Sequence, residues 1–138
     1  MIIMGVDLGS VRTGIAVSDN GESFAFPRCV ITERNQEALI DKILDEARAS
    51  GAKRLVVGLP KNMDGSIGFQ AQYCLDFKAM LEKEIKLPVI MIDERMTSKM
   101  AHNTMLRADM SRNKRKQNVD KLAATIILQS YLDSLPRY

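Results

Sequence analysis

The sequence predicts an α/β fold built on a mixed five-stranded sheet, in which the first three strands are antiparallel and the later strands parallel. Three short apolar segments follow one another at the start of the chain and are separated only by turns. Two further apolar segments come later, each after a stretch with apolar residues at helical spacing. Strands joined by tight turns run antiparallel, whereas strands separated by helices run parallel. With 138 residues, the chain is expected to form a single domain, 1–138.

The first three strands are expected to form a meander. The apolar run 2–8 is followed by the glycine-bounded turn 9–14, after which 15–17 is apolar again. An Asp-Asn-Gly turn then leads into a third extended segment, 23–31, in which Pro27 indicates an edge strand or a bulge.

The rest of the chain alternates helices and strands. Asn35, Thr97 and Asn118 each precede a helical pattern that they can cap. Gly51 ends the helix that Asn35 caps, and Pro88 ends the helix before the fifth strand. The last helix is apolar on most sides and should therefore pack closely on the sheet. The expected segments are a helix from Asn35 to Gly51, a strand at 54–60, a helix at 73–85, a strand at 89–92, and helices at 97–108 and 119–135.

Composition excludes several classes of protein. The hydrophobic fraction of 46% and the charged fraction of 27% are ordinary for a globular protein. The longest apolar runs fall far short of the roughly 20 residues that span a bilayer, and the start lacks a secretion signal, so we expect a cytoplasmic protein without a membrane partner. Cys29, Cys74 and His102 supply too few nitrogen and sulfur ligands for structural zinc.

An acidic residue stands inside the first apolar run. Ionised Asp7 among Ile3, Val6 and Leu8 would cost several kcal/mol unless a cation, a metal ion or hydrogen-bond donors met it. Asp7 is therefore the strongest candidate for a functional residue.

Three further acids lie near the ends of predicted elements. The pair Asp93-Glu94 ends the fifth strand, and Asp120 falls in the first turn expected for the last helix. Acids gathered in one cleft are what Mg²⁺-dependent phosphodiester chemistry requires. Two other interpretations stay open: Asp120 could simply stabilise the start of its helix, and Asp93 or Glu94 could pair with Arg95 at the surface.

Positive charge is concentrated in residues 107–121. This segment carries six basic against two acidic side chains, a local charge of +4, while the whole chain has a net charge of +3. A local basic run favours a polyanionic partner such as a nucleic acid, although many such runs are only solvated loops. Because aromatic residues are nearly absent from the run, recognition of backbone or shape is favoured over base stacking.

Four motifs in this order resemble the YqgF or RuvX proteins, a family described as Holliday junction resolvases and as nucleases of pre-16S rRNA. The resemblance spans the chain. The motifs are GVDLGSVRTGIAVSD at 5–19, VVGLPKNMDGS at 56–66, IDERMTS at 92–98 and SRNKRKQNVDKLAATIILQSYL at 111–132.

The resemblance implies a ribonuclease-H-like fold and hydrolysis of phosphodiester bonds that depends on Mg²⁺, with Mn²⁺ as a possible substitute. By matching motifs, the catalytic and metal-binding acids would be Asp7, Glu94 and Asp120. In such a sheet the fifth strand is not adjacent to the first, so Glu94 would have to reach across two strand spacings of about 4.8 Å each. Asp93 is its competitor, because neighbouring strand residues point to opposite faces. The implied nucleic-acid-binding residues are Lys61, Asn62, Arg95, Thr97, Arg112, Lys114, Arg115, Lys116 and Lys121.

The leading hypothesis is a metal-dependent endonuclease that acts on structured nucleic acid. Processing of the 5′ end of precursor 16S ribosomal RNA is preferred by resemblance, and cleavage of a four-way DNA junction is second. A junction resolvase should be a two-fold dimer, whereas an RNA-processing enzyme can be a monomer or a homodimer.

Two other classes remain as alternatives. A non-catalytic RNA-binding protein would need only the basic run, with the acids in structural roles. Phosphate-binding ATPases of the actin and sugar-kinase type share an acid-glycine turn in a hairpin, but they close two domains around the nucleotide, which 138 residues do not provide.

Overall fold

A computed structural model describes residues 1–96 and 112–136, and for residues 96 and 112–120 it describes the backbone alone. The five strands form one sheet in the order β3-β2-β1-β4-β5. β1 and β3 run antiparallel to β2, whereas β4 is parallel to β1 and β5, which confirms the mixed sheet expected from the sequence. The elements are β1 (Ile2–Asp7), β2 (Arg12–Ser18), β3 (Ala25–Thr32), α1 (Gln36–Ser50), β4 (Ala52–Leu59), α2 (Phe69–Glu84), β5 (Val89–Asp93), the 3₁₀ turn η1 (Glu94–Met96) and α4 (Arg112–Ser134).

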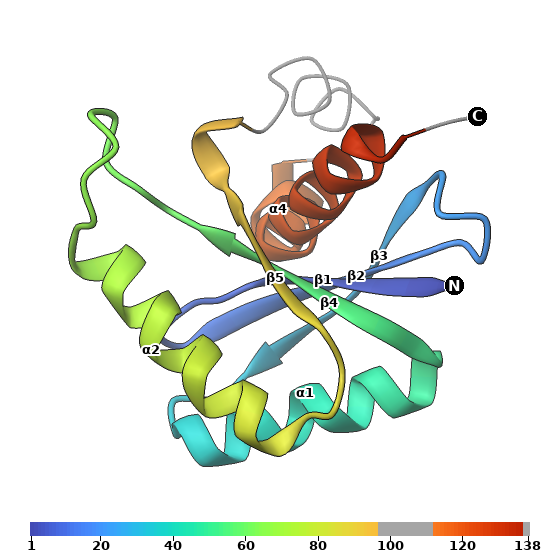
Figure 1. Cartoon of the computed structure of the whole chain (residues 1–138), viewed down its shortest axis with the longest axis horizontal. Helices are drawn as coiled ribbons and strands as arrows, with labels where there is room; N and C mark the ends of the chain where they lie inside the picture. Colours follow the sequence, from blue (N-terminus) through green and yellow to red (C-terminus); the bar gives the residue numbers. More distant parts are fainter. Residues whose placement is uncertain (97–111, 137–138) are drawn as a thin grey trace.

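Helices cover both faces of the sheet. Figure 1 shows α1 and α2 on one side and α4 on the other. Along β1, Met4 and Val6 are fully buried in the core cluster under α1 and α2, while Ile3 is fully buried in the cluster under α4. This alternation follows from the two-residue period of a strand and explains why β1 is apolar on both faces.

β3 forms one edge of the sheet, as Pro27 predicted. Cys29 pairs with Ile15 and Pro27 pairs with Ala16, so Arg28 is an extra residue and the strand is bulged at this point. An edge strand tolerates proline because the missing N–H is not needed for a further neighbour.

The ends of α1 also follow the sequence. The Asn35 side chain accepts a hydrogen bond of 2.9 Å from the Ala38 N–H, which is the geometry of an N-cap. Gly51 ends the helix with a φ of 75°, in the left-handed region that glycine adopts at little cost.

The start of the last helix differs from the expectation. We expected Asn118 to cap a helix beginning at Val119, but α4 begins at Arg112 and continues through both residues. Arginine, lysine and glutamine are good helix formers, so the basic run extends the helix, and an asparagine within it costs only a few tenths of a kcal/mol. Asp120 therefore lies about two turns inside α4 and not in its first turn. The helix expected at 97–108 lies outside the described residues.

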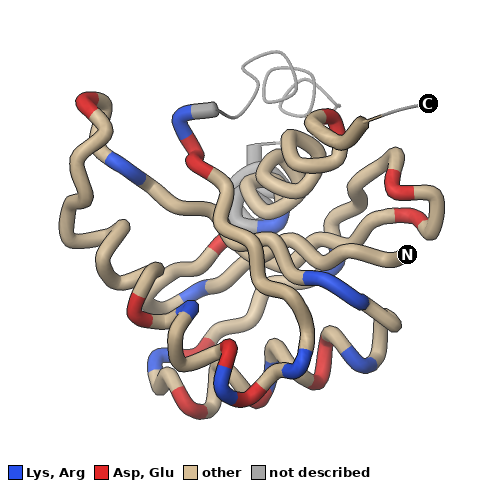
Figure 2. Tube along the Cα trace, in the orientation of Figure 1, with Lys and Arg blue, Asp and Glu red and all other residues tan. Residues whose placement is uncertain are grey.

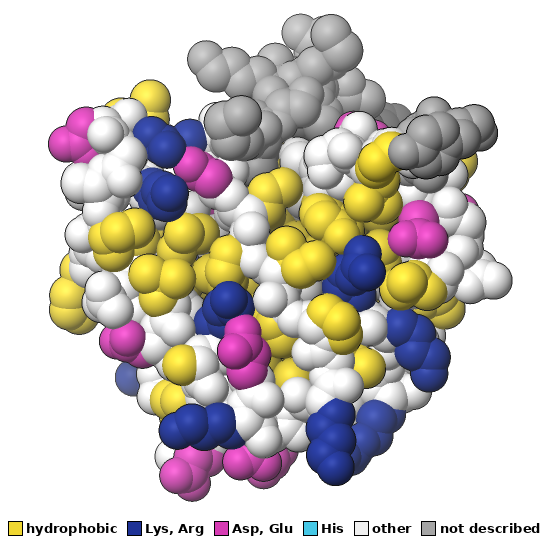
Figure 3. Space-filling model, in the orientation of Figure 1, with side chains coloured by type: hydrophobic (Ala, Val, Ile, Leu, Met, Phe, Trp, Pro, Cys, Tyr) yellow, Lys and Arg dark blue, Asp and Glu magenta, His cyan; other side chains and the backbone are white. Residues whose placement is uncertain are grey.

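Charges and apolar side chains are distributed unevenly over the surface. Figure 2 shows acidic and basic residues mixed along α1 and α2, and again close together at the end of β5. Every residue of β5 is partly exposed, and Figure 3 shows hydrophobic side chains across the middle of the face along which this strand runs. Within the described part of the chain, we find no helix with the length and hydrophobicity needed to cross a membrane.

Candidate active site

Two acidic residues lie where two parallel strands of the sheet end, at its carboxyl edge. Asp7 is the last residue of β1, and Glu94 follows directly after β5, at the start of η1. β4 lies between these two strands, so the backbones that carry the two acids are two strand spacings apart, as the resemblance implied. The carboxyl ends of parallel strands are where sites commonly form.

Gly58 of β4 provides the space that Glu94 occupies. A Cβ atom at Gly58 would lie only 2.8 Å from Glu94 Oε1 and 2.6 Å from Ile127 Cδ1. The side chain of Glu94 therefore lies over the backbone of the middle strand, where any other residue would exclude it.

Gly58 also stands beside Asp7. Val6 pairs with Val57, and continuing this parallel register by one residue brings Asp7 level with Gly58. On its other side Asp7 pairs with Gly14 of β2. Both strands that flank Asp7 thus carry a glycine next to it, so neither neighbouring position places a side chain beside Asp7 on this face.

Both carboxylates lie on the face of the sheet that α4 covers. A Cβ atom at Gly5 would lie 2.7 Å from Leu128 Cβ, so Gly5 faces α4, and Asp7, two residues later, faces the same way. Gly58, over which Glu94 lies, faces Ile127 of the same helix. The acids that the sequence predicted from separate elements are therefore brought together here.

The charge state of Glu94 reflects this environment. Burial raises the pKa of the Glu94 carboxyl, and the negative charge of Asp93 raises it further. Burial also raises the pKa of the Cys74 thiol to about 11, with the charges of Glu94 and Asp7 adding to the effect. Both carboxylates thus lie within electrostatic range of one buried thiol of α2.

Asp93, the competitor of Glu94, is engaged elsewhere. Its carboxylate accepts hydrogen bonds from Arg95 Nε at 3.0 and 3.1 Å and from Nη2 at 2.7 Å. The hydrogen bonds from this guanidinium lower the pKa of Asp93. The pairing with Arg95 that the sequence left open for either acid is made by Asp93, and Glu94 is the acid that lies over Gly58.

The backbone of α4 carries Asp120 toward the same edge. Ala124 and Ile127, four and seven residues after Asp120, pack on Gly5 and Gly58. Further along the helix, Tyr131 accepts a 2.7 Å hydrogen bond from Arg54, near the start of β4. α4 therefore runs antiparallel to β4, and Asp120 belongs to its end nearer Asp7, although its side chain lies outside the described residues.

The predicted substrate-binding residues fall into separate groups. Lys61, Asn62 and Arg95 lie together, because Arg95 contacts the loop between β4 and α2 that carries the other two. Lys121 lies on the opposite side of α4 from this group, toward Cys29 of β3. Burial raises the pKa of the Cys29 thiol, and the charge of Lys121 lowers it slightly. The remaining predicted members lie outside the described side chains: Thr97, Arg112, Lys114, Arg115 and Lys116.

The donor atoms present suit a hard divalent cation. Among the residues whose side chains are described, no group of three histidine, cysteine, aspartate or glutamate residues is close enough to hold a metal ion. Asp7 and Glu94 nevertheless both supply carboxylate oxygens on the face of the sheet that α4 covers. Mg²⁺ is commonly held by one or two carboxylates together with water and substrate phosphates, so these two residues fit such an ion.

Sequence reasoning missed Gly58. An isolated glycine within an otherwise apolar strand is a recognised sign of a close approach by another group. The run Val56-Val57-Gly58-Leu59 contains this sign, but only the structure shows that the approaching group is Glu94.

Comparisons with known proteins find a matching family and relatives along nearly the whole chain. The model of a family described as RuvX, Holliday junction resolvase, matches residues 1–134. A protein of Natranaerobius thermophilus named "Putative pre-16S rRNA nuclease" is 47% identical over 96% of this chain and 94% of its own length. A protein of Clostridium beijerinckii with the same name is 44% identical over 99% of both chains.

Solved structures with the same fold include resolvases. The Fowlpox virus resolvase, in a complex with Holliday junction DNA, aligns with a TM-score of 0.63 and 15% identity over 99% of this chain and all of that one. Thermus thermophilus RuvC aligns with a TM-score of 0.60 and 14% identity over 96% of each chain. At these identities the likeness concerns the fold alone, and it confirms the ribonuclease-H-like architecture that the sequence motifs implied.

Proposed function

This chain belongs to the RuvX family of Holliday junction resolvases, and on that basis we propose that it is a metal-dependent endonuclease that hydrolyses phosphodiester bonds in structured nucleic acid. The observation that supports this most directly is the placement of Glu94 over Gly58, on the same face as Asp7. A carboxylate that lies over a neighbouring strand, on the same face as a second carboxylate, is stabilised there when both bind one cation.

In the proposed site, Asp7, Glu94 and Asp120 hold Mg²⁺, or Mn²⁺ in its place. The bound ion would supply positive charge to ionise a water molecule and to stabilise the leaving oxygen of the phosphodiester. The three acids act by holding the ion and not by attacking phosphorus. Burial beneath α4 limits water around Glu94 and strengthens its attraction for a cation.

The substrate we propose is precursor 16S ribosomal RNA, cut at its 5′ end. The names of the relatives at 47% and 44% identity support this choice. A four-way DNA junction is the second candidate, supported by the description of the family. Lys61 and Lys121, which lie on different sides of the carboxylates, are proposed to contact phosphates, and Asn62, Thr97 and the 112–116 run are further candidates. The proposed location is the cytoplasm.

The decisive experiment compares Asp7→Asn with the unchanged protein on both substrates in Mg²⁺. Asp7→Asn keeps the size of the side chain but removes the charge that binds the ion, so cleavage should fall by at least about 100-fold. Glu94→Gln should act in the same direction. Asp41→Asn, at an exposed position of α1, is the matched control and should cleave at the normal rate.

Folding and binding complete the test. Circular dichroism should be unchanged in Asp7→Asn, and binding of both nucleic acids in EDTA should be retained. Undiminished cleavage by Asp7→Asn would sink the assignment. If the unchanged protein binds RNA but cuts neither substrate with Mg²⁺ or Mn²⁺, a non-catalytic RNA-binding protein becomes the better account.

A further inference from the structure

The loop between β4 and α2 has a defined shape of its own. The Asn62 N–H donates to the Ser66 carbonyl at 3.0 Å, and the Gly65 N–H donates to the Asn62 carbonyl at 2.8 Å. Asp64 Oδ1 accepts from the Ser66 N–H at 2.9 Å, and Asn62 Nδ2 donates to Ser66 Oγ at 2.9 Å. Gly65 has a φ of 87°, which other residues adopt only with strain. Residues 61–68, hereafter the β4–α2 loop, are therefore held in one turn.

Arg95 ties the tip of the β4–α2 loop to the end of β5. Its Nη1 donates to the Met63 carbonyl at 3.3 Å, while Nε and Nη2 donate to Asp93. A Cβ atom at Gly65 would lie 3.3 Å from Arg95 Nη1, so the guanidinium occupies space beside a residue without a side chain. The loop and the end of β5, about 30 residues apart in sequence, are thus joined through one side chain.

Asp93 fixes the turn around Glu94 as well. Its Oδ1 accepts a 3.0 Å hydrogen bond from the Arg95 N–H, so the carboxylate closes a local turn that spans Glu94. Asp93 and Arg95, the residues before and after Glu94, are therefore joined through the Arg95 backbone N–H and through the Arg95 guanidinium. This arrangement holds η1 in the geometry that directs Glu94 over Gly58.

The guanidinium of Arg95 is poorly placed to bind a phosphate. Arginine binds carboxylate or phosphate best through two parallel N–H groups, and the Nε and Nη2 edge of Arg95 is already occupied by Asp93. The side chains of Arg95 and Asp93 are only 31% and 20% exposed. A substrate phosphate that bound this edge would have to displace Asp93.

We propose that Asp93 and Arg95 form a latch of two positioning residues that orders the β4–α2 loop and directs Glu94 before nucleic acid binds, and that Arg95 does not itself contact phosphate. This differs from the expectation that Arg95 holds substrate. The purpose of the latch rests on the proposed function, because Glu94 and Lys61 are placed for that site. The existence of the latch does not rest on the proposed function, so the latch can be tested without a cleavage assay.

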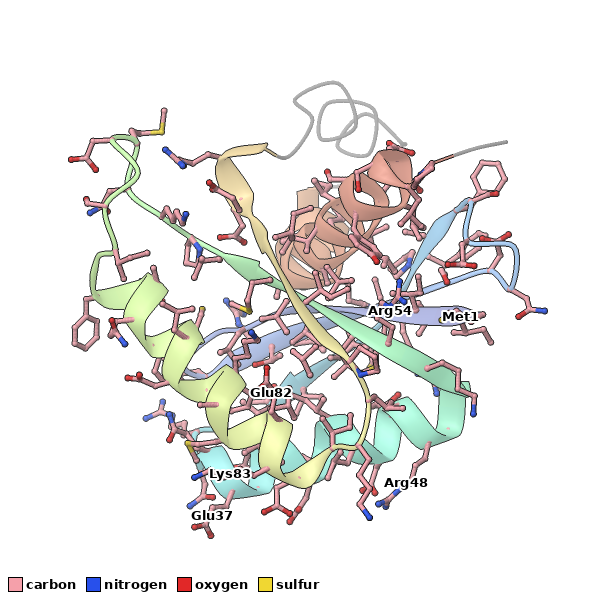
Figure 4. The ribbon with its side chains drawn as sticks, viewed as in Figure 1. Met1, Glu37, Arg48, Arg54, Glu82 and Lys83 are labelled. Carbon is pink, nitrogen blue, oxygen red and sulfur yellow. The ribbon has the colours of Figure 1, made fainter. Side chains whose placement is uncertain are left out.

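The first test measures hydrogen exchange of the backbone amides of 61–68 and 94–96 in the full chain without metal. Asp93→Ala and Arg95→Met should each speed exchange in both segments by about tenfold or more, since loss of one bonded partner frees the loop. Arg95→Lys should do the same, because lysine lacks the two-pronged donor edge. Arg48→Met and Asp45→Ala, at an exposed pair on α1 labelled at Arg48 in Figure 4, are the matched controls and should leave both segments unchanged.

The second test measures binding of a synthetic four-way DNA junction and of a precursor 16S leader transcript in EDTA at several salt concentrations. With a latch, Asp93→Ala and Arg95→Met weaken binding by similar factors, and the double variant is no weaker than either single one. The dependence of log K on log salt stays the same in Arg95→Met. A direct phosphate contact would instead reduce that slope by about 0.9, Arg95→Lys would keep most of the affinity, and Asp93→Ala would tighten binding.

The two proposals fail separately. Unchanged exchange in the Asp93→Ala and Arg95→Met proteins overturns the latch whether or not the protein cuts nucleic acid. A reduced salt slope in Arg95→Met combined with tighter binding by Asp93→Ala also overturns it. If exchange rises as expected but the unchanged protein cleaves neither substrate, the latch stands and the nuclease assignment falls.

Discussion

At the level of single residues, the candidate site depends on positions without a side chain as much as on its acids. Gly58 leaves room for Glu94, Gly14 pairs beside Asp7, and Gly5 lets α4 approach β1 closely. A carboxylate can reach across a strand only if the backbone beneath it is bare. The glycines thus decide whether the two acids can meet.

Gly58→Ala should therefore damage both packing and metal binding. The new methyl group would meet Ile127 Cδ1 and Glu94 Oε1 within 3 Å, so the ends of both side chains must move. Overpacking of this kind costs about 1 to 3 kcal/mol of folding free energy. Displacement of Glu94 should add a loss of Mg²⁺ affinity of about 10-fold or more, measured by titration of the folded protein.

Gly5→Ala is the matched control for this prediction. Its methyl group would meet Leu128 Cβ at 2.7 Å under the same helix, but Glu94 is not among its nearest neighbours. Gly5→Ala should lose at least as much stability, because it also meets the Ala124 carbonyl of the helix backbone at 3.0 Å, and it should keep more of its Mg²⁺ affinity than Gly58→Ala. Equal losses of affinity in both variants would mean that α4, and not the space over Gly58, controls the site.

The sequence predicted Asp7 and left its partner undecided for a physical reason. An ionisable group inside an apolar strand is visible in the sequence because burial of an unpaired charge is costly. The choice between Asp93 and Glu94 is not visible, because strand alternation states only that one of the two faces the site. That choice depends on Arg95, whose guanidinium binds Asp93 and leaves Glu94 to lie over Gly58.

At the level of elements, strands and capped helices could be predicted more fully than α4. The apolar run of β1, the proline in β3 and the cap at Asn35 are local signals, and each is confirmed. The start of α4 reflects a competition between two local signals, because the helix-forming residues of the basic run at 112–116 continue the helix past the cap signal at Asn118. Asn118, a good cap in isolation, is an interior residue for this reason.

The turn between β2 and β3 offers a test by pH. Asp19 Oδ1 accepts hydrogen bonds of 2.8 Å from the Ser23 and Phe24 N–H groups, and the bonds from Phe24 and Ser23 lower the pKa of the Asp19 carboxyl. A lowered pKa in the folded state means that the ionised form contributes stability above the unfolded value of about 3.9. This contribution is lost as the pH falls from there through the folded pKa.

Asp19→Ala should therefore be less stable than the unchanged protein at neutral pH, and the difference should shrink as the pH falls below about 4. The midpoint of urea unfolding, followed from pH 7 down to pH 3, measures it. Asp19→Asn retains an acceptor oxygen without a charge, so its deficit at pH 7 should be smaller than that of Asp19→Ala and should likewise shrink as the pH falls. A difference between Asp19→Ala and the unchanged protein that stays constant with pH would contradict the role of the ionised carboxylate.

At the level of the whole molecule, the fold places the site near one edge of the sheet, at the end of β5, and away from the other edge. The carboxylates lie where β1, β4 and β5 end, whereas β3 forms the far edge. Pro27 and the bulge at Arg28 interrupt that edge, and such features discourage pairing of the sheet with a second copy. The architecture thus provides one site per chain and does not favour a dimer formed through β3.

The number of chains in the active species separates the two candidate substrates. A four-way junction is resolved by two symmetric cuts, which requires two sites related by a two-fold axis, whereas one cut in precursor RNA needs a single site. For the proposed RNA substrate, the cleavage rate per chain should stay constant when the protein is diluted, and sedimentation equilibrium should give a monomer at the same concentrations. If the rate per chain instead falls on dilution in step with dissociation of a dimer, junction resolution becomes the better assignment, because only that reaction loses its second site when the chains separate.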